Sequence, residues 1–174
     1  MIQKILSVKE PSLRQKSKPV KKYDKKLKLL IKDLKDTLIA QKNPEGIGLA
    51  APQIGKNVRV FIIKPQNYIE VFINPEVIEM KKLKVNKKND KKIMEGCLSL
   101  PHFYGPLERS FKVRLKYQNE EGKYFDKEFD GLNAQIVLHE IDHLDGVLFI
   151  DRLLEQKGKL YEFKNGEWSE VELI

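Results

Sequence analysis

His139-Glu140-Ile141-Asp142-His143 is the stretch of sequence that decides the fold of this chain. It has the pattern H-E-x-x-H, and because residues i and i+4 of an α-helix lie on one face, both imidazoles can reach a single metal ion. Glu140 directly follows His139 and cannot be a third ligand in the same plane, but it can hold a water that the metal activates. The alternative is a helix that carries two histidines by chance. The chain has three histidines and two fall in this motif, which favours the metal site.

The residues around the motif predict that it lies on a helix. Asp130 or Asn133 can cap the N-terminus of this helix, and Gly146 stands where a glycine is expected just past the C-terminus. An apolar face is supplied by Ile136, Val137, Ile141 and Leu144. We therefore expect a largely buried helix that presents both histidines on one side.

Length and composition favour one globular domain, placed at residues 1–174. Hydrophobic residues make up 41% of the chain and charged residues 33%. No apolar run is long enough for a signal peptide, or for the roughly 20 residues of a membrane span. The single cysteine excludes an internal disulfide, so we expect a reducing cytoplasm, of bacterial type or in an organelle.

The net charge is +8, and lysines supply most of it. Such a surface is attracted to polyanions such as ribosomal RNA or acidic lipid. The commoner explanation of a lysine-rich surface is a solvated face, and the chain contains no known nucleic-acid motif. We expect no membrane partner, no sequence-specific nucleic acid and a monomer, with contact to the ribosome surface as the open alternative.

Apolar spacing predicts a helix over about residues 24–40, in which leucine and isoleucine recur every three or four positions. A segment of small residues follows at 46–55, and strands are expected at 58–63 and 71–74, each ended by a proline. The lysine-dense residues 81–92 are expected to form an exposed hairpin or loop.

Two hairpins are predicted nearer the C-terminus. Residues 111–117 and 123–129 alternate in polarity and are joined by Glu120-Glu121-Gly122. Residues 160–163 and 168–173 flank Asn165-Gly166, a dipeptide typical of tight hairpin turns.

Two histidines leave a catalytic metal site short of a protein ligand, because such sites use three ligands and a water. Cys97, His102 and several carboxylates are candidates for the third ligand. A thiolate with two imidazoles suits Zn(II) or Fe(II). The alternative for Cys97 is a small buried hydrophobic residue, and spacing alone does not decide between them.

Three segments together resemble the peptide deformylase family: residues 46–53 (GIGLAAPQ), residues 95–99 (EGCLS) and the H-E-x-x-H motif at 139–143. They stand in the order and spacing of that family, and the resemblance runs from the first helix to Leu154. Together with the predicted elements, it implies an α+β fold. Mostly antiparallel β-sheets surround a central helix that bears the motif, with an N-terminal helix and a C-terminal β-hairpin.

The resemblance implies a metal-dependent hydrolase that removes the N-formyl group from formyl-methionine at the start of newly made polypeptides and releases formate. Cys97, His139 and His143 are implied as metal ligands, and Glu140 as the general base and acid while activated water attacks the formyl carbon. The implied metal is one divalent ion, Fe(II), for which Zn(II), Ni(II) or Co(II) can substitute.

By the same resemblance, Gln53 and the backbone N–H of Leu98 are the donors to the oxyanion. The implied substrate-binding residues are Ile47, Gly48, Gly96, Ile136 and Arg109. Glu95 and Arg109 are expected either to pair and hold the cysteine loop in place, or to form an exposed ion pair of little energetic value.

Two other functions remain open. A catalytically silent metal-binding module of the same fold would be expected to lose Glu140, which is present. An H-E-x-x-H endopeptidase is disfavoured by the Cys97 ligand and by the tight segment from Gly48 to Gln53. The chain departs from the family at His102, where glycine is common, and in ending with a hairpin instead of a long helix.

Overall fold

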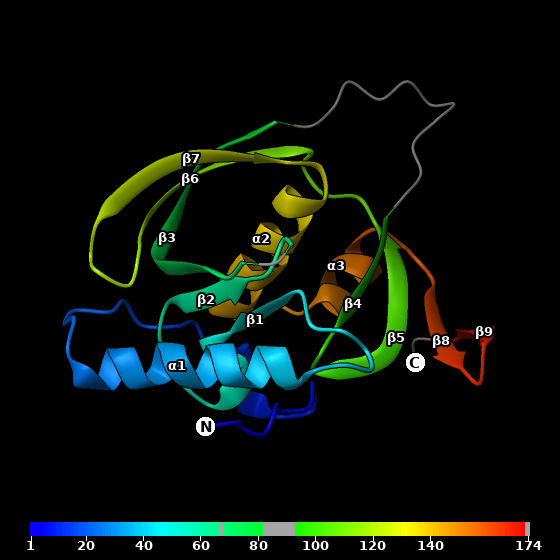
Figure 1. Ribbon diagram of the computed structural model, residues 1–174. Helices are drawn as coiled ribbons and strands as arrows, with labels where there is room; N and C mark the ends of the chain where they lie inside the picture. The colour runs from blue at the N-terminus through cyan, green and yellow to red at the C-terminus, as the bar shows by residue number, and fades with distance from the viewer. Residues whose placement is uncertain (67, 82–92, 173–174) are drawn as a thin grey trace.

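The computed structural model describes residues 1–66, 68–81 and 93–172. Two sheets, in which each strand pair is antiparallel, flank a central helix α2 (Gly131–Leu144), as Figure 1 shows. The five-stranded sheet has the order β1-β2-β3-β6-β7 and the four-stranded sheet the order β4-β5-β8-β9. The predicted fold class, antiparallel sheets around the helix with the motif, is confirmed.

The elements of the five-stranded sheet are β1 (Gly48–Ala50), β2 (Val60–Ile63), β3 (Glu70–Lys81), β6 (Lys112–Gln118) and β7 (Tyr124–Asp130). Those of the four-stranded sheet are β4 (Ile93–Cys97), β5 (Leu100–Leu107), β8 (Leu160–Lys164) and β9 (Glu167–Val171). The other helices are α1 (Lys25–Ala40), α3 (Phe149–Glu155) and two short 3₁₀ helices, η1 (Pro11–Arg14) and η2 (Ala51–Ile54).

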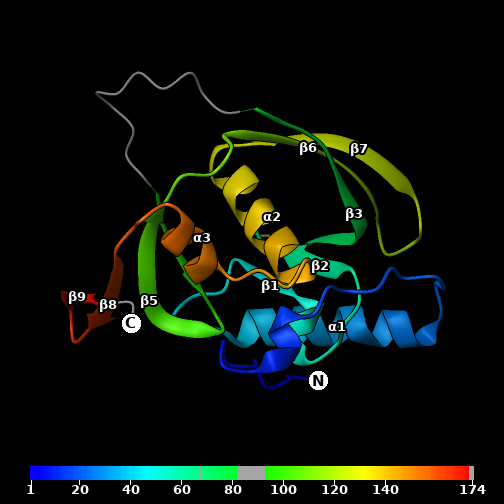
Figure 2. The ribbon, with the colours of Figure 1, turned by 180° about the vertical axis from the view of Figure 1, so that it is seen from behind.

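Helix α1 forms as the apolar spacing predicts. Asp24 caps it by accepting hydrogen bonds from the backbone N–H groups of Lys26 and Leu27, an interaction worth about 1 kcal/mol. Its apolar stripe is buried against the five-stranded sheet, and the stripe consists of Leu27, Ile31, Leu34 and Leu38. Figure 2 shows α1 along the side of this sheet that faces away from α2.

Strand β2 explains how the five-stranded sheet is held between two helices. All four of its residues are buried. Val60 and Ile62 pack in the cluster around α1, whereas Phe61 and Ile63 pack in the cluster around α2. Alternate residues of a strand point to opposite faces, so a short continuous apolar run can serve both layers.

Strand β3 is longer than predicted, and the expectation that it ends at Pro75 is wrong. A proline lacks the N–H that a sheet ladder needs, but the register with β6 shifts between Ile73 and Glu76, so Pro75 sits in a bulge. Asn74 adopts a positive φ of 49° at this point. The Asn74 side chain accepts a hydrogen bond from the backbone N–H of Val20 and donates one to the backbone carbonyl of Val20.

The four-stranded sheet packs on α3, a helix that the sequence did not predict. The buried cluster between them is formed by Cys97, Leu107, Phe149, Leu153 and Leu160. Both predicted hairpins are confirmed as the pairs β6–β7 and β8–β9. Of the predicted loop at 81–92, residues 82–92 lie outside the described residues. None of the described helices is long and apolar enough to cross a membrane.

Helix α2 is buried from Ala134 to Leu144, as expected for a helix between two sheets. Asp130 occupies the N-cap position, although its side chain makes no capping hydrogen bond. At the other end Gly146 takes a positive φ of 75° and its N–H donates to the carbonyl of His143. Glycine is favoured here because a Cβ would lie 2.5 Å from the carbonyl oxygen of Arg14.

Candidate metal centre

Three nitrogen and sulfur ligand groups from two distant parts of the chain meet in the interior. His139 and His143 project from one face of α2, and Cys97 stands at the end of β4. One ligand atom of each lies within 4.8 Å of the other two, and Cys97 Sγ is 3.2 Å from His143 Nε2. The fold therefore brings together the Cys, His and His expected from the sequence, in an arrangement able to hold one metal ion.

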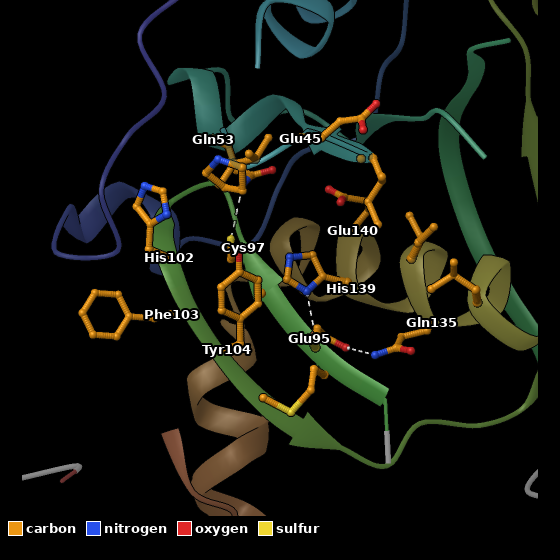
Figure 3. Close-up of a pocket in the computed structure, with 18 residues that line it drawn as sticks. Glu45, Gln53, Glu95, Cys97, His102, Phe103, Tyr104, Gln135, His139 and Glu140 are labelled. Carbon is orange, nitrogen blue, oxygen red and sulfur yellow. Dashed lines mark hydrogen bonds and ion pairs between the residues drawn. The ribbon is translucent and has the colours of Figure 1, made fainter. Parts of the chain in front are cut away.

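Glu95 orients the first of these histidines. Its Oε1 lies 2.6 Å from His139 Nδ1, and Gln135 donates a hydrogen bond of 3.0 Å to its Oε2 (Figure 3). Burial raises the pKa of the Glu95 carboxyl, but Arg109 and His139 outweigh burial and hold this pKa well below its usual range. The carboxylate must accept, so Nδ1 of His139 carries the proton and Nε2 is left as the ligand atom.

The two histidine rings favour the form of Cys97 that binds metals. Burial raises the pKa of a thiol, but the adjacent His143 and His139 rings outweigh burial and lower the pKa of Cys97 well below its usual range. The thiolate is the metal ligand, and a thiolate with two imidazoles suits Zn(II) or Fe(II). The buried donor set thus fits a divalent cation.

Arg109 ties the cysteine strand to the histidine helix. It donates to both oxygens of Glu95, at 2.6 and 2.7 Å, and to Asp142 at 2.8 Å. Arg152 of α3 also donates to Asp142, at 2.8 Å to Oδ1 and 3.2 Å to Oδ2. The side chains of Glu95 and Arg109 are 6% and 9% exposed, so the predicted pair is a buried one and the exposed alternative is wrong.

Glu140 lies on the pocket side of α2, close to the edge strand β1. A Cβ built on Gly48 would lie 2.3 Å from Glu140 Oε1, so the absence of a side chain at Gly48 makes room for this carboxyl group. Glu140 Oε2 is buried and has no hydrogen-bond partner among the described residues. Burial raises the pKa of Glu140 to about 7, against the opposing effect of His139 and His143. Such a group can exchange protons near neutral pH.

Gln53 reaches the same centre from the 3₁₀ helix η2. Its side-chain oxygen accepts from the backbone N–H of Ala50 at 2.8 Å, which fixes the direction of the amide. Its Nε2 lies 3.2 Å from Ser99 Oγ and 3.5 Å from Cys97 Sγ. The amide N–H₂ is therefore aimed at the turn that contains Leu98, next to the metal ligands.

A cavity of about 280 Å³ opens over the metal centre. The predicted site residues that line it are Ile47, Gly48, Gln53, Gly96, Cys97, Leu98, Ile136, His139 and Glu140. His143 lies deeper, 1% exposed, and Arg109 is placed elsewhere, in the ion pairs beneath the pocket. Arg109 thus lies behind Glu95 and outside the pocket lining, and its role in substrate binding stays a prediction.

Met94, Tyr104 and Leu132 also line the pocket and were not predicted as part of the site. His102, a candidate for the third ligand, lines the pocket too, but the group of possible metal ligands in the described residues is Cys97, His139 and His143. His102 adopts a positive φ of 69°, a conformation that favours glycine. This backbone conformation gives a physical reason why glycine suits the position. Figure 3 shows Tyr104 projecting toward the pocket from β5.

Comparison with known proteins identifies the family of this chain. The family model described as "Polypeptide deformylase" matches residues 2–159. The chain belongs to the peptide deformylase family. It is 45% identical over 155 residues to a peptide deformylase of Pseudothermotoga lettingae, covering 87% of this chain and 82% of that protein.

Solved deformylase structures have the same fold. The Thermotoga maritima peptide deformylase aligns with a TM-score of 0.77 and 38% identity, covering 87% of this chain and 97% of that one. The Thermus thermophilus enzyme aligns with a TM-score of 0.79 and 37% identity, covering 90% of this chain and 88% of that one. These matches identify the chain as a deformylase, an enzyme that removes the formyl group from new polypeptides.

Sequence reasoning missed the buried ion pairs that Asp142 makes with Arg109 and Arg152. Asp142 lies inside the H-E-x-x-H motif, on a helix that the sequence predicts to be largely buried, and a buried carboxylate requires a charged partner. That requirement was a usable signal. In the structure Asp142 is 7% exposed. The sequence could not show that the partners would be Arg109 and Arg152, because the segment after β5 and helix α3 meet α2 only in the folded chain.

Proposed function

We propose that Cys97, His139 and His143 hold one divalent cation and that the side chains around it carry out deformylation. The observation that carries the proposal is the convergence of a low-pKa thiol and two imidazoles within 4.8 Å, in a buried pocket. When bound, the cation supplies a Lewis acid that makes a water molecule acidic enough to lose its proton near neutral pH.

Glu140 acts as general base and then as general acid. Its carboxyl group is buried, has a pKa of about 7, and has one oxygen, Oε2, without a partner among the described residues. It can take the proton of the attacking water and deliver it to the nitrogen of the leaving amine. Glycine at position 48 keeps the space that this carboxyl group occupies.

Gln53 and the backbone N–H of Leu98 stabilise the charge that grows on the formyl oxygen. The Gln53 amide is fixed by its bond to the Ala50 N–H, so its donor end is already oriented. A preorganised donor of this kind is typically worth about 3 kcal/mol of barrier.

The substrate peptide enters between two sheet edges. Strands β1 and β4 are terminal strands of the two sheets, and both contribute residues to the pocket wall. An extended peptide can add to such an edge through main-chain hydrogen bonds at Gly48 and Gly96. Ile47 and Ile136 provide apolar walls for the methionine side chain.

Fe(II) is the proposed native metal, and Zn(II), Ni(II) or Co(II) can take its place because the thiolate and imidazole donors suit all of them. We further propose a monomer in a reducing cytoplasm, with the basic surface, net charge +8, contacting the ribosome. Co-sedimentation with ribosomes that weakens steeply with salt would support that contact, and salt-independent or absent co-sedimentation would refute it.

Glu140→Gln tests the role of the carboxyl group. The variant should retain metal at the wild-type stoichiometry, because Glu140 is not a ligand, and should lose nearly all formate release from formyl-methionine peptides. Formate release and metal content are measured on anaerobically prepared Fe(II) protein. Equal turnover in the two proteins would exclude Glu140 as base.

A further inference from the structure

The C-terminal hairpin carries aromatic side chains that adjoin the pocket. Trp168 of β9 lies 5.4 Å from Tyr104 of β5 between ring centroids, in a T-shaped contact at 70°, and 4.8 Å from Phe163 of β8. We call these three residues the aromatic patch. Trp168 is 54% exposed and Phe163 is 37% exposed. The patch is therefore a connected apolar surface that remains open to solvent.

Strand pairing places the patch on the outer face of the four-stranded sheet. Phe163 pairs directly with Trp168, and residues in a direct pair point to the same face. The opposite face of the same hairpin carries Leu160 and Val171, which pack in the cluster around α3. The hairpin thus has its own buried side, and the patch is not needed to fill that core.

Tyr104 joins the patch to the pocket. It lines the pocket, and its ring covers Gly96, where a Cβ would lie 2.7 Å from two ring carbons. Gly96 directly precedes the ligand Cys97. The Tyr104 ring therefore borders the pocket, while Trp168 contacts it from the hairpin.

The hairpin stands outside the part of the chain that matches the family model, which ends at residue 159. Adjacent exposed aromatic rings commonly mark a binding surface. Because the patch continues the wall of the substrate pocket, its occupant should be the part of the substrate that extends beyond the pocket.

We propose that the aromatic patch binds the third and fourth residues of the formyl-methionine peptide and favours apolar side chains there. This inference rests on the proposed function of the pocket. An extended peptide advances about 3.4 Å per residue, so the 5.4 Å from Tyr104 to Trp168 corresponds to between one and two residues. Tyr104 pairs with Gly96, and both line the pocket. With formyl-methionine inside the pocket, the residues that reach past Tyr104 to Trp168 are those that follow the second residue of the peptide.

Three peptides test the preference by formate release: formyl-Met-Ala, formyl-Met-Ala-Ser-Ser and formyl-Met-Ala-Leu-Leu. Trp168→Ala should lower kcat/KM for the Leu-Leu peptide about fivefold, through KM, because it removes binding that is equal in the ground and transition states. The Ser-Ser peptide and the dipeptide should change less than twofold. Trp168→Phe should retain most of the preference, because it keeps an aromatic ring on a folded hairpin.

Tyr124→Ala is the matched control, since Tyr124 is an aromatic residue with 77% exposure on β7 of the other sheet. It should leave the kcat/KM values of all three peptides unchanged. A loss for all three peptides in Trp168→Ala, with none in the control, would indicate a general structural role for Trp168 and overturn the proposal.

Tryptophan fluorescence gives a second readout without altering the patch, because Trp168 is the single tryptophan of the chain. In the Glu140→Gln protein, which should bind peptide without turnover, the Leu-Leu peptide should shift the emission to shorter wavelength and formyl-Met-Ala should not. Unchanged emission at saturating Leu-Leu peptide would overturn the proposal. Formate release from all peptides without discrimination would refute this inference alone, whereas no release from any of them would refute the proposed function as well.

Discussion

Replacing Gly48 by alanine should remove most of the turnover while leaving the protein folded. The added Cβ would lie 2.3 Å from Glu140 Oε1 and 3.0 Å from Glu140 Cδ, whereas ordinary van der Waals contact begins near 3.4 Å. The carboxyl group must therefore move by about 1 Å. A misplacement of that size can lower kcat on the order of 100-fold, equivalent to about 2.7 kcal/mol of barrier.

The stability of this variant should change little. Glu140 meets the new methyl group with the end of a flexible side chain, which can move at small cost, and alanine is favoured over glycine in a strand by roughly 0.5–1 kcal/mol. The free energy of unfolding, measured by urea titration, should stay within about 1 kcal/mol of the parent value.

The assay compares kcat for formate release in Gly48→Ala, Glu140→Gln and the double variant. If the methyl group acts by displacing Glu140, it should add almost nothing to the loss already caused by Glu140→Gln. A kcat for Gly48→Ala above half the parent value, or a full additional loss in the double variant, would refute the reasoning.

Two further predictions concern the residues around the metal ligands. Gln53→Ala should lower kcat about 10²–10³-fold at unchanged metal content, because it removes an oriented donor; a loss below about fivefold would exclude that role. Glu95→Gln should weaken metal binding about 10–100-fold, measured by competition with a chelator, because His139 loses its anionic partner. The fold lowers the pKa of Glu95 below its ordinary 4.5, so the carboxylate stabilises the fold fully above about pH 4.5, and this stabilisation is lost as the pH falls through the lowered pKa. The free energies of unfolding of parent and variant should therefore differ at pH 7 and converge in acid. A difference that stays constant over this pH range would contradict the assignment.

The regular elements could be predicted where local pattern and tertiary packing agree. Helix α1 has its cap and its apolar stripe, and the hairpin β8–β9 has an Asn165-Gly166 turn in which both residues adopt positive φ. Local signals of this kind need no knowledge of the rest of the chain.

The elements that sequence reasoning missed depend on distant partners. Helix α3 has seven residues, too short for a clear apolar period, and it is fixed by packing under β4 and β5. Strand β5 contains Pro101, Gly105 and Pro106, which locally disfavour a strand, yet it pairs on both sides with β4 and β8.

Some residues of the candidate site could likewise be predicted from the sequence, and others could not. The spacing of His139 and His143 predicts two ligands on one helical face, and the resemblance to a family supplied Cys97, which spacing alone left undecided. The positions of Arg109 and Asp142 could not be deduced, because their ion pair joins the segment after β5 to α2 across the buried centre.

The most direct test of the metal centre is a crystal structure of the Fe(II)- or Co(II)-loaded protein with anomalous diffraction at the absorption edge of the metal. We expect one cation about 2.3 Å from Cys97 Sγ and about 2.1 Å from a ring nitrogen of both His139 and His143. A cation bound elsewhere, or a Cys97 thiol out of its reach, would contradict the proposed centre.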